Sequence, residues 1–479
     1  MREVRPIGTE VLEALPAAPA ETIHADYKAA MEGFSPKIIV LDDDPTGIQT
    51  VHGIPVYTEW DEAAILDGFR SDARMFFLLT NSRALSAHET ASLHGSIAER
   101  IAKASEETGK DFVLISRGDS TLRGHYPLEP DTLKNTVERL TGRQYRGEIV
   151  IPFFPEGGRF TLDNVHYVRS GDALTPAGMT EFANDKTFAY RASDLTEWIE
   201  EKTQGACRAE DVVSVSVEEL RAREYDGIFR KLTEGGGYSR IVVNAAAYCD
   251  LEAFAVPLVR AMRSGFRFVF RTAAALPKVL GNVDDAPLLT RSVLVPDGNR
   301  SGGMIVIGSH VRKTTAQLEE LKKSRLPIEY VEFDQHRVLE EGGLEDETKR
   351  VCALAEEKIR SGITVAVYTR RDRLDFGTED PERQLALSVR ISRAVTGVVE
   401  GLTVRPSFLI AKGGITSSEI GTRALGVKKA LALGQIRPGV PVWQTGEESK
   451  FPFLPYVIFP GNVGTEDDLR LAVETFFEP

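Results

Sequence analysis

The sequence predicts an α/β protein of two domains, each a mostly parallel sheet flanked by helices, with the active site in the cleft between the domains. Three observations predict this fold class. From about residue 37 onward, short apolar or β-branched runs alternate with longer segments of helical period. The length of 479 residues suits two or three domains. One stretch rich in Pro, Gly, Asn and Ser, at 284–303, interrupts the alternation.

The first half begins with an N-terminal extension over residues 1–35 and continues as a first domain over 36–283. Strands are expected at Lys37–Leu41, Arg74–Leu79, Asp111–Ile115, Glu148–Ile151, Val212–Val215 and Arg240–Val243. Helices are expected at Ala87–Ser105, Glu129–Leu140, Leu195–Glu201, Val217–Leu232 and Leu251–Arg263. The order of these elements predicts βα units around a parallel sheet.

The second half restarts the same alternation after the linker at 284–303, and forms a second domain over 304–479. Strands are expected at Met304–Ile307, Ile328–Phe333, Thr364–Tyr368, Ser407–Ala411, Val440–Trp443 and Tyr456–Phe459. Helices are expected at Lys313–Lys323, Glu345–Arg360, Arg383–Val398 and Thr416–Leu425, with a last helix from Glu466. Ligands of such sheets bind at the carboxyl ends of the strands, so the loops there are the candidate sites.

The composition is that of a globular protein, with 42% hydrophobic residues and a formal net charge of −13. An acidic surface disfavours non-specific binding to nucleic acids and to anionic membranes. The three cysteines lie far apart and predict neither disulfides nor a zinc site. No apolar run approaches the 18 residues of a membrane span and no secretion signal is evident, so we expect a cytoplasmic protein.

An acidic turn follows the first strand, where Asp42, Asp43 and Asp44 precede Pro45-Thr46-Gly47. Three neighbouring carboxylates repel one another unless a cation or a proton relieves them. One interpretation is that a carboxylate of this turn acts as a general base, or faces Mg²⁺, in phosphoryl transfer. The other is that the turn is solvated and caps the next segment. The spacing of Asp42 and Asp44 also fits the nucleophile loop of haloacid-dehalogenase-type phosphatases.

Two basic turns follow the next two strands. Arg83 lies in the turn after Arg74–Leu79, and its planar guanidinium suits a carboxylate. The turn after Asp111–Ile115 is dense in polar side chains: Arg117, Asp119, Ser120, Thr121 and Arg123. A similar Gly-rich turn ends in Arg159. Together these turns predict a crevice for a small polyhydroxylated anion.

The second half lacks both a P-loop and a GxGxxG fingerprint, but three of its strands end in glycine loops. These loops contain Gly308-Ser309, Gly413-Gly414-Ile415-Thr416 and Gly461-Asn462-Val463-Gly464, and each opens a helix. Backbone N–H groups at helix starts bind anions, so the loops predict a phosphate-binding region.

Taken together, these turns resemble those of the four-carbon acid sugar kinases (D-threonate, D-erythronate and 3-oxo-tetronate kinases). The resemblance covers about residues 36–479. It rests on Asp43-Asp44-x-Thr46-Gly47, Ser82-Arg83-x-x-Ser86, Asp119-Ser120-Thr121-Leu122-Arg123-Gly124, Gly308-Ser309, Gly413-Gly414-x-Thr416 and Gly461-Asn462-x-Gly464. It implies that the first domain binds a sugar acid and that the second binds ATP.

The resemblance also implies roles for individual residues. Catalysis is assigned to Asp43 or Asp44, substrate binding to Arg83, Arg117, Asp119, Ser120, Thr121 and Arg123, and ATP binding to Ser309, Gly413, Gly414, Ile415, Thr416, Gly461 and Gly464. The expected cofactors are ATP and Mg²⁺, with no metal ligand assigned. The expected partners are small molecules, neither nucleic acid nor membrane, and a homo-oligomer is left open.

The sequence thus predicts an ATP-dependent kinase that phosphorylates the terminal hydroxyl of a four-carbon sugar acid. One alternative is a haloacid-dehalogenase-like phosphatase that uses Asp42 and Asp44. The other is a non-catalytic nucleotide or sugar-acid sensor, suggested by Arg117 and Ile415, which stand where the family usually has a lysine and an acidic residue.

Overall fold

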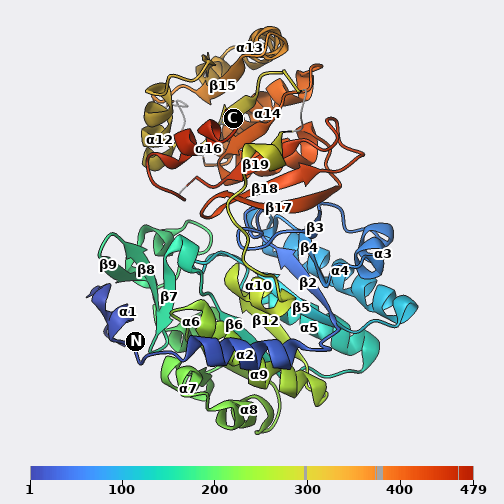
Figure 1. Ribbon diagram of the computed structural model, residues 1–479, viewed down its shortest axis with the longest axis vertical. Helices are drawn as coiled ribbons and strands as arrows, with labels where there is room; N and C mark the ends of the chain where they lie inside the picture. The colour runs from blue at the N-terminus through green and yellow to red at the C-terminus, as the bar shows by residue number, and fades with distance from the viewer. Residues whose placement is uncertain (1, 296–298, 373, 375–380, 462, 478–479) are drawn as a thin grey trace. The chain divides into compact units, whose positions relative to one another are not determined.

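A computed structural model describes residues 2–295, 299–372, 374, 381–461 and 463–477, with the backbone alone for 381–385. The chain forms two compact units, of which the first comprises Met1–Gly47 and Glu59–Asp285 and the second comprises Ile48–Thr58 and Ala286–Pro479. The polypeptide therefore passes from one unit to the other after Gly47, after Thr58 and after Asp285. Figure 1 shows the elements of each unit.

The first unit is built on a parallel sheet of order β10-β11-β6-β12-β5-β2-β4. Its strands are β2 (Lys37–Asp42), β4 (Met75–Leu79), β5 (Phe112–Arg117), β6 (Gly147–Ile151), β10 (Val213–Val215), β11 (Ser239–Val243) and β12 (Phe268–Thr272). The central strands read as continuous apolar runs because helices cover the sheet, and every residue of β2, β4 and β5 is buried. Since all the strands are parallel, their carboxyl ends lie along one edge.

The helices of the first unit precede, connect and follow these strands (Figure 1). They are α1 (Glu10–Ala14), α2 (Ala20–Met31), α3 (Glu62–Arg70), α4 (Ala87–Thr108), α5 (Leu128–Thr141), α6 (Leu195–Lys202), α7 (Val217–Arg221), α8 (Tyr225–Thr233), α9 (Tyr248–Arg263) and α10 (Ala275–Gly281). Ser86 and Glu89 form a capping box at the start of α4, as its sequence indicates. Within the N-terminal extension, α2 packs beside α9, and the buried Tyr27 hydroxyl donates to the carbonyl of Val279 (2.7 Å).

A second, antiparallel sheet in the first unit has the order β1-β9-β8-β7. Its strands are β1 (Ile7–Gly8), β7 (Arg159–Leu162), β8 (Val165–Ser170) and β9 (Ala173–Pro176). This sheet was not predicted, because its strands are short and β8 ends in the exposed polar residues Arg169 and Ser170.

The sheet of the second unit has the order β3-β17-β18-β19-β16-β13-β15-β14. Its strands are β3 (Ile54–Tyr57), β13 (Met304–Ile307), β14 (Ile328–Phe333), β15 (Thr364–Thr369), β16 (Leu409–Lys412), β17 (Lys429–Arg437), β18 (Val440–Thr445) and β19 (Pro455–Phe459). Five strands, from β19 to β14, are parallel, while β3, β17 and β18 pair antiparallel. The loops after β13, β16 and β19 therefore meet at one sheet edge.

The helices of the second unit are α11 (Arg291–Leu294), α12 (Arg312–Lys322), α13 (Gly343–Arg360), α14 (Pro381–Gly401), α15 (Gly414–Glu419) and α16 (Asp468–Glu474). Short 3₁₀ segments in the chain are η1 (Ser82–Ala84), η2 (Pro155–Gly157), η3 (Ala177–Met179), η4 (Glu181–Asn184), η5 (Ala209–Asp211) and η6 (Gln335–Leu339), and a π turn, η7, spans Ile420–Ala424. Helices α12 and α16 pack together against the sheet, where Phe408 and Phe476 stack with their ring centroids 3.8 Å apart.

The predicted fold class is confirmed: both units are sheets flanked by helices, mostly parallel. Besides the antiparallel sheet, three strands were not predicted, and one of them is Lys429–Arg437, which is β17. Phe268–Thr272 is β12 at the centre of the first sheet. Ile54–Tyr57 falls within the range expected for the first domain, yet it belongs to the second unit because it pairs with β17.

Candidate active site

The turns after β2, β4 and β5 lie side by side at the carboxyl edge of the first sheet. Neighbouring strands place them there: Asp42 is in register with Leu79 on one side and with Arg117 on the other. The backbone closes this arrangement, since the N–H of Asp43 donates to the carbonyl of Arg117 (3.2 Å) and that of Thr80 donates to Asp42 (2.9 Å). The sequence prediction that these turns converge is therefore correct within the first unit.

The three aspartates of the acidic turn have different environments. Asp42 and Asp43 are each only 2% exposed, and both accept hydrogen bonds from the Arg117 guanidinium (3.0 and 3.4 Å). Burial raises the pKa of Asp42 to about 7, although Arg117 favours its ionised form. Asp44 is the least buried, with 16% of its side chain exposed, and it accepts from the backbone N–H of Thr46 (2.7 Å). Asp44 is thus the carboxylate of the turn that a ligand can reach most easily.

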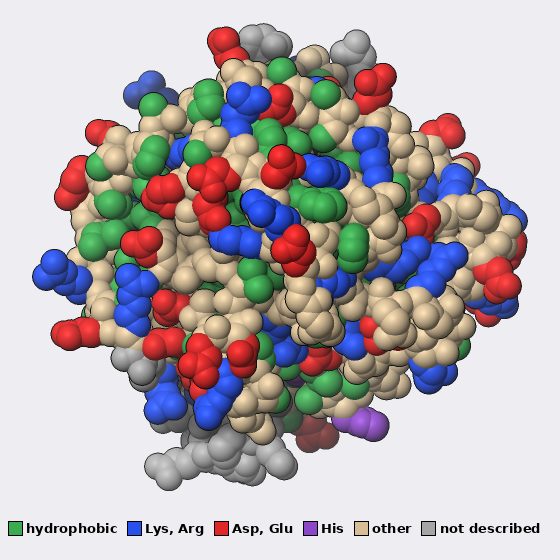
Figure 2. Space-filling view, turned by 90° about the horizontal axis from the view of Figure 1, so that it is seen from below, with side chains coloured by type: hydrophobic (Ala, Val, Ile, Leu, Met, Phe, Trp, Pro, Cys, Tyr) green, Lys and Arg blue, Asp and Glu red, His purple; other side chains and the backbone are tan. Residues whose placement is uncertain are grey.

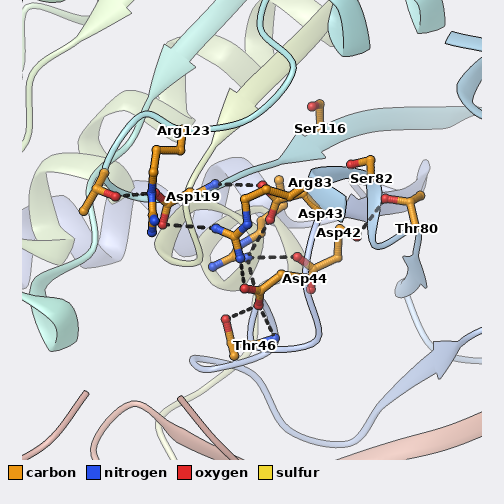
Figure 3. Close-up of polar contacts among 12 residues, drawn as sticks. Asp42, Asp43, Asp44, Thr46, Thr80, Ser82, Arg83, Ser116, Asp119 and Arg123 are labelled. Carbon is orange, nitrogen blue, oxygen red and sulfur yellow. Dashed lines mark hydrogen bonds and ion pairs between the residues drawn. The ribbon is translucent and has the colours of Figure 1, made fainter. Parts of the chain in front are cut away.

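Arg83 joins the turns together (Figure 3). Its guanidinium forms ion pairs with Asp44 and with Asp119 (3.4 Å to the latter). Asp119 also accepts from Arg123 Nε (2.7 Å) and from the hydroxyl of Thr121. Burial by itself would raise the pKa of Asp119, but Arg123 and Arg83 outweigh it and hold that pKa well below its usual range. The result is an alternating row of carboxylates and guanidiniums.

A buried second row supports this site from behind. Glu129 accepts hydrogen bonds from the hydroxyls of Ser82 (2.6 Å) and Ser116 (3.1 Å). Arg271, near the end of β12, pairs with Glu129 (3.4 Å) and donates to the carbonyl of Arg123 (2.8 Å). Gly118 lies against Arg271, which leaves no room there for a Cβ. Neither Glu129 nor Arg271 was predicted as a site residue; Arg271 lies in Phe268–Thr272, whose apolar residues indicate a buried strand.

Ser120 and Thr121 are held from the other side by two buried side chains. Ser120 is 7% exposed and Thr121 is 0% exposed. The Nε2 atom of His166 bonds to the carbonyl of Ser120 (2.8 Å), and the hydroxyl of Tyr190 donates to the carbonyl of Thr121 (2.6 Å). Ser120 and Thr121 therefore shape the loop through buried side chains and anchored carbonyls.

In the second unit, the glycine loops after β13, β16 and β19 come together. A Cβ at Gly308 would lie closer than 3.0 Å to Thr416, and Gly461 faces the Ser309 hydroxyl, 3.2 Å from its ideal Cβ position. Gly413 has φ +120°, a conformation that L side chains rarely adopt, and its Cβ position is 3.1 Å from Ser309. The predicted residues Ser309, Gly413, Thr416 and Gly461 are therefore neighbours.

Polar side chains fix the backbone of these loops. Thr314, on α12, donates to the carbonyl of Gly461 (3.2 Å), and Gln317 donates to the carbonyl of Thr465 (2.7 Å). Lys412 is 0% exposed and its Nζ donates to the carbonyl of Pro460 (2.6 Å). None of these three residues was predicted as a site residue. Lys412 directly precedes the Gly413-Gly414 motif, and this was the one sign of its place in the site.

Two models of protein families match the chain. One, a sugar-binding N-terminal domain, matches residues 38–280, and the other, a nucleotide-binding C-terminal domain, matches residues 304–469. Together they are the architecture of the four-carbon acid sugar kinases. The chain belongs to this family. The family of the first matched domain is described as sugar-binding and that of the second as nucleotide-binding, which is the order that the resemblance implies.

Solved structures of other proteins share the fold of this four-carbon acid sugar kinase family member. A Salmonella typhimurium LT2 protein with a provisional tRNA synthase name aligns with a TM-score of 0.64 and 16% identity, over 91% of this chain and 98% of its own. A Haemophilus influenzae protein of the DUF1537 family aligns with a TM-score of 0.57 and 19% identity, over 91% of this chain and 100% of its own. No curated protein matches the sequence.

The remaining residues that were expected to contact ligands differ in how exposed they are to solvent. Arg117 is only 4% exposed and is held between Asp42 and Asp43, which makes it a support of the acidic turn. Ile415 is 72% exposed, while Gly464 lies beside Asp468. Asn462, part of the last glycine motif, lies outside the described residues. The binding and catalytic roles of all these residues stay predictions.

Among the described residues, no group of three or more His, Cys, Asp or Glu side chains is placed to hold a metal ion. Mg²⁺ is often bound through substrate phosphates and only one or two carboxylates, so a kinase needs no such cage.

The phosphatase alternative requires an accessible Asp42, whereas this side chain is 2% exposed and lies against Gly47. The geometry disfavours that alternative.

On the face shown in Figure 2, acidic and basic side chains are interspersed and are not gathered by sign. In the part of the chain that the structure describes, no helix has both the length and the apolar character needed to cross a membrane.

The role of His166 in holding the loop at Ser120 can be tested through the pH dependence of stability. Burial lowers the pKa of His166 to about 4, whereas an unfolded histidine titrates near 6.5. The unfolded chain therefore binds the proton first, and the contribution of His166 to stability is present above pH 6.5 and is lost as the pH falls to about 4. We expect the free energy of unfolding to fall by the order of 3 kcal/mol more in the wild type than in His166→Gln between pH 7 and pH 4. Urea titrations at each pH measure this.

The matched control is His88→Gln, since His88 is exposed on α4. This variant should keep the pH dependence of the wild type. Equal pH dependence in the wild type and in His166→Gln would show that His166 is not held neutral in the folded protein.

Proposed function

We propose that this protein is an ATP-dependent kinase that phosphorylates the terminal hydroxyl of a four-carbon sugar acid, of the threonate, erythronate or 3-oxo-tetronate type. The observation that carries the proposal is the row of Asp44, Arg83, Asp119 and Arg123 at one edge of the sugar-binding domain. Alternating carboxylates and guanidiniums provide acceptors for sugar hydroxyls and donors for an anionic group.

Asp44 is proposed as the general base. It is the most exposed carboxylate of the acidic turn, and it pairs with Arg83 and accepts from the Thr46 N–H. In this role it accepts the proton of the attacking hydroxyl while that oxygen bonds to the γ-phosphorus and the bond to the β-phosphate oxygen breaks. Asp43, fully buried against Arg117 and the Asp119 N–H, is then the residue that positions the turn.

The glycine loops of the nucleotide-binding domain are proposed to hold the phosphates of ATP. Gly308, Gly413 and Gly461 keep the space around Ser309 and Thr416 open, so a phosphate can approach the backbone N–H groups closely. When bound, Mg²⁺ would neutralise charge on the phosphate oxygens. Phosphoryl transfer also requires the two domains to present their ligands to each other, and positioning of this kind supplies much of the catalysis in kinases.

The proposal is tested by a screen of ADP release. The protein is incubated with Mg²⁺-ATP and each stereoisomer of threonate, erythronate and 3-oxo-tetronate in turn, and ADP is measured with a coupled assay. At least one acid is expected to raise the rate of ADP release at least tenfold above the rate without acid. If no acid raises this rate, the proposal is wrong, and nucleotide binding without transfer would then favour the sensor alternative.

A further inference from the structure

Most arginines around the candidate site already have carboxylate partners. Ion pairs of 4.0 Å or less join Arg83 to Asp44 and Asp119, Arg117 to Asp42 and Asp43, Arg123 to Asp119 and Asp185, and Arg271 to Glu129. These pairs balance positive charge before any ligand binds. An anionic ligand would have to compete with the protein's own carboxylates for each of these guanidiniums.

Arg159 differs from these arginines because it has no direct carboxylate partner in the part of the chain that the structure describes. It is the first residue of β7 and follows the turn Pro155–Gly158, and no carboxylate among the described residues lies within ion-pair distance of its guanidinium. Its Nε is buried without a hydrogen-bond partner, although the residue as a whole is partly exposed. Burial lowers the pKa of Arg159, but a guanidinium stays charged in a protein. Asp119 acts on the charge of Arg159 from beyond ion-pair distance, but it is paired directly with Arg83 and Arg123. An anionic ligand would therefore give this partly buried cation a direct partner.

This cation lies beside the candidate site. The guanidiniums of Arg159 and Arg123 both contact the ring of Phe182, at 5.8 and 5.1 Å from its centroid. Arg123 in turn bonds to Asp119 (2.7 Å) in the row that contains Arg83. The turn before Arg159 makes room for it, because a Cβ at Gly157 would lie 3.2 Å from its Nη1.

We infer that Arg159, next to Arg123 on the Phe182 ring, binds the carboxylate of the acceptor substrate. This inference rests on the proposed function and adds the part of the site that selects acids over neutral sugars. A carboxylate accepts two parallel N–H bonds from a guanidinium, and it would supply the direct ion-pair partner that no described carboxylate gives Arg159. The opposite end of a four-carbon acid, its terminal hydroxyl, is then the end left for Asp44.

The test uses four-carbon ligands that differ at C1, which is a carboxylate in the acids and a hydroxymethyl group in the neutral polyols. Binding of threonate and erythronate, and of the neutral polyols threitol and erythritol, is measured by calorimetry without ATP. The proteins are the wild type, Arg159→Gln, Arg159→Lys and the control Arg191→Gln, whose side chain is 79% exposed and pairs only loosely with Glu201 (3.9 Å). Arg159→Gln is expected to weaken binding of the acid by roughly 10- to 100-fold, as loss of a charged hydrogen bond does. Weak binding of the polyols should be unchanged.

Arg159→Lys keeps the charge but not the two parallel donors, so it should bind the acid with intermediate affinity. Thermal melts show whether each variant is folded, and the affinity for ATP should be the same in all four proteins. Tight acid binding by folded Arg159→Gln overturns the inference, as does a loss of ATP affinity with no loss of acid affinity. A wild type that binds none of the acids also overturns it.

The outcome for the inference is separable from that for the proposed function. If the wild type transfers phosphate to an acid and Arg159→Gln does so with an unchanged KM, only the inference fails. If the wild type binds the acid through Arg159 but transfers no phosphate, only the proposed kinase function fails.

Discussion

Asp44→Asn should lower kcat with the preferred sugar acid by about 10²- to 10⁴-fold, the effect typical of removing a general base. Asparagine has nearly the shape of aspartate and can still accept from the Thr46 N–H, but it cannot accept the proton of the attacking hydroxyl. Since Asp44 belongs to the sugar-binding domain, the KM for ATP should change little. Steady-state kinetics with saturating acid and varied ATP measure both quantities.

Asp43→Asn is the matched variant, one residue earlier in the same turn. Asp43 is buried and accepts from Arg117 and from the Asp119 N–H, so its loss should lower thermal stability more than Asp44→Asn does. A stable Asp43→Asn variant with a large loss of kcat, next to an Asp44→Asn variant with near wild-type turnover, would assign the base to Asp43. Near wild-type turnover in both variants would remove the acidic turn from the mechanism.

Gly308→Ala should lower kcat/KM for ATP by about 10²-fold, because small displacements of positioned groups have effects of that size. The added Cβ would lie closer than 3.0 Å to Thr416 and would push its side chain away from the loops after β13 and β16. The sugar-binding domain holds none of the displaced residues, so binding of the sugar acid measured without ATP should stay as in the wild type.

Two further variants sharpen this prediction. Gly236→Ala adds the same methyl group where nothing lies within 4 Å, and should leave kcat/KM unchanged. The double variant Gly308→Ala/Thr416→Ala removes the contacted side chain and should be no worse than Thr416→Ala alone, which is the non-additivity expected of two groups that clash. Full additivity of the two single effects would argue against the steric explanation.

The fold class could be predicted because its signal is local. Strands such as Ile38–Leu41 and Met75–Leu79 are buried on both faces and therefore read as unbroken apolar runs between amphipathic helices. The turns after these strands could be grouped as one site for the same reason, since parallel strands of a sheet end at the same edge. The glycine loops after β13, β16 and β19 follow the same logic in the second unit.

What could not be predicted depends on pairings between distant residues. Arg271 supports a loop some 150 positions earlier in the chain, and the structure alone shows that it occupies the space beside Gly118. The sequence offered Arg83, Arg117, Arg123 and Arg159 as similar cations. Which of them is buried against aspartates and which lacks a direct partner follows from strand register and from the β7–β8 hairpin. The Asp163-Asn164 turn is a local sign of the hairpin, but it does not tell which arginine is left without a carboxylate. In the same way, Ile54–Tyr57 left no local sign that it pairs with β17.

The most direct test of the central claim identifies the product by ³¹P NMR. The wild-type protein is incubated with Mg²⁺-ATP and the sugar acid that gives the fastest ADP release, and the new phosphorus resonance is followed with coupling to the protons of its carbon. The account predicts ADP and one phosphate monoester on the terminal CH₂ group in equal amounts, and neither with Asp44→Asn within the same time. Inorganic phosphate formed in place of the ester, or an ester formed equally fast by Asp44→Asn, would contradict it.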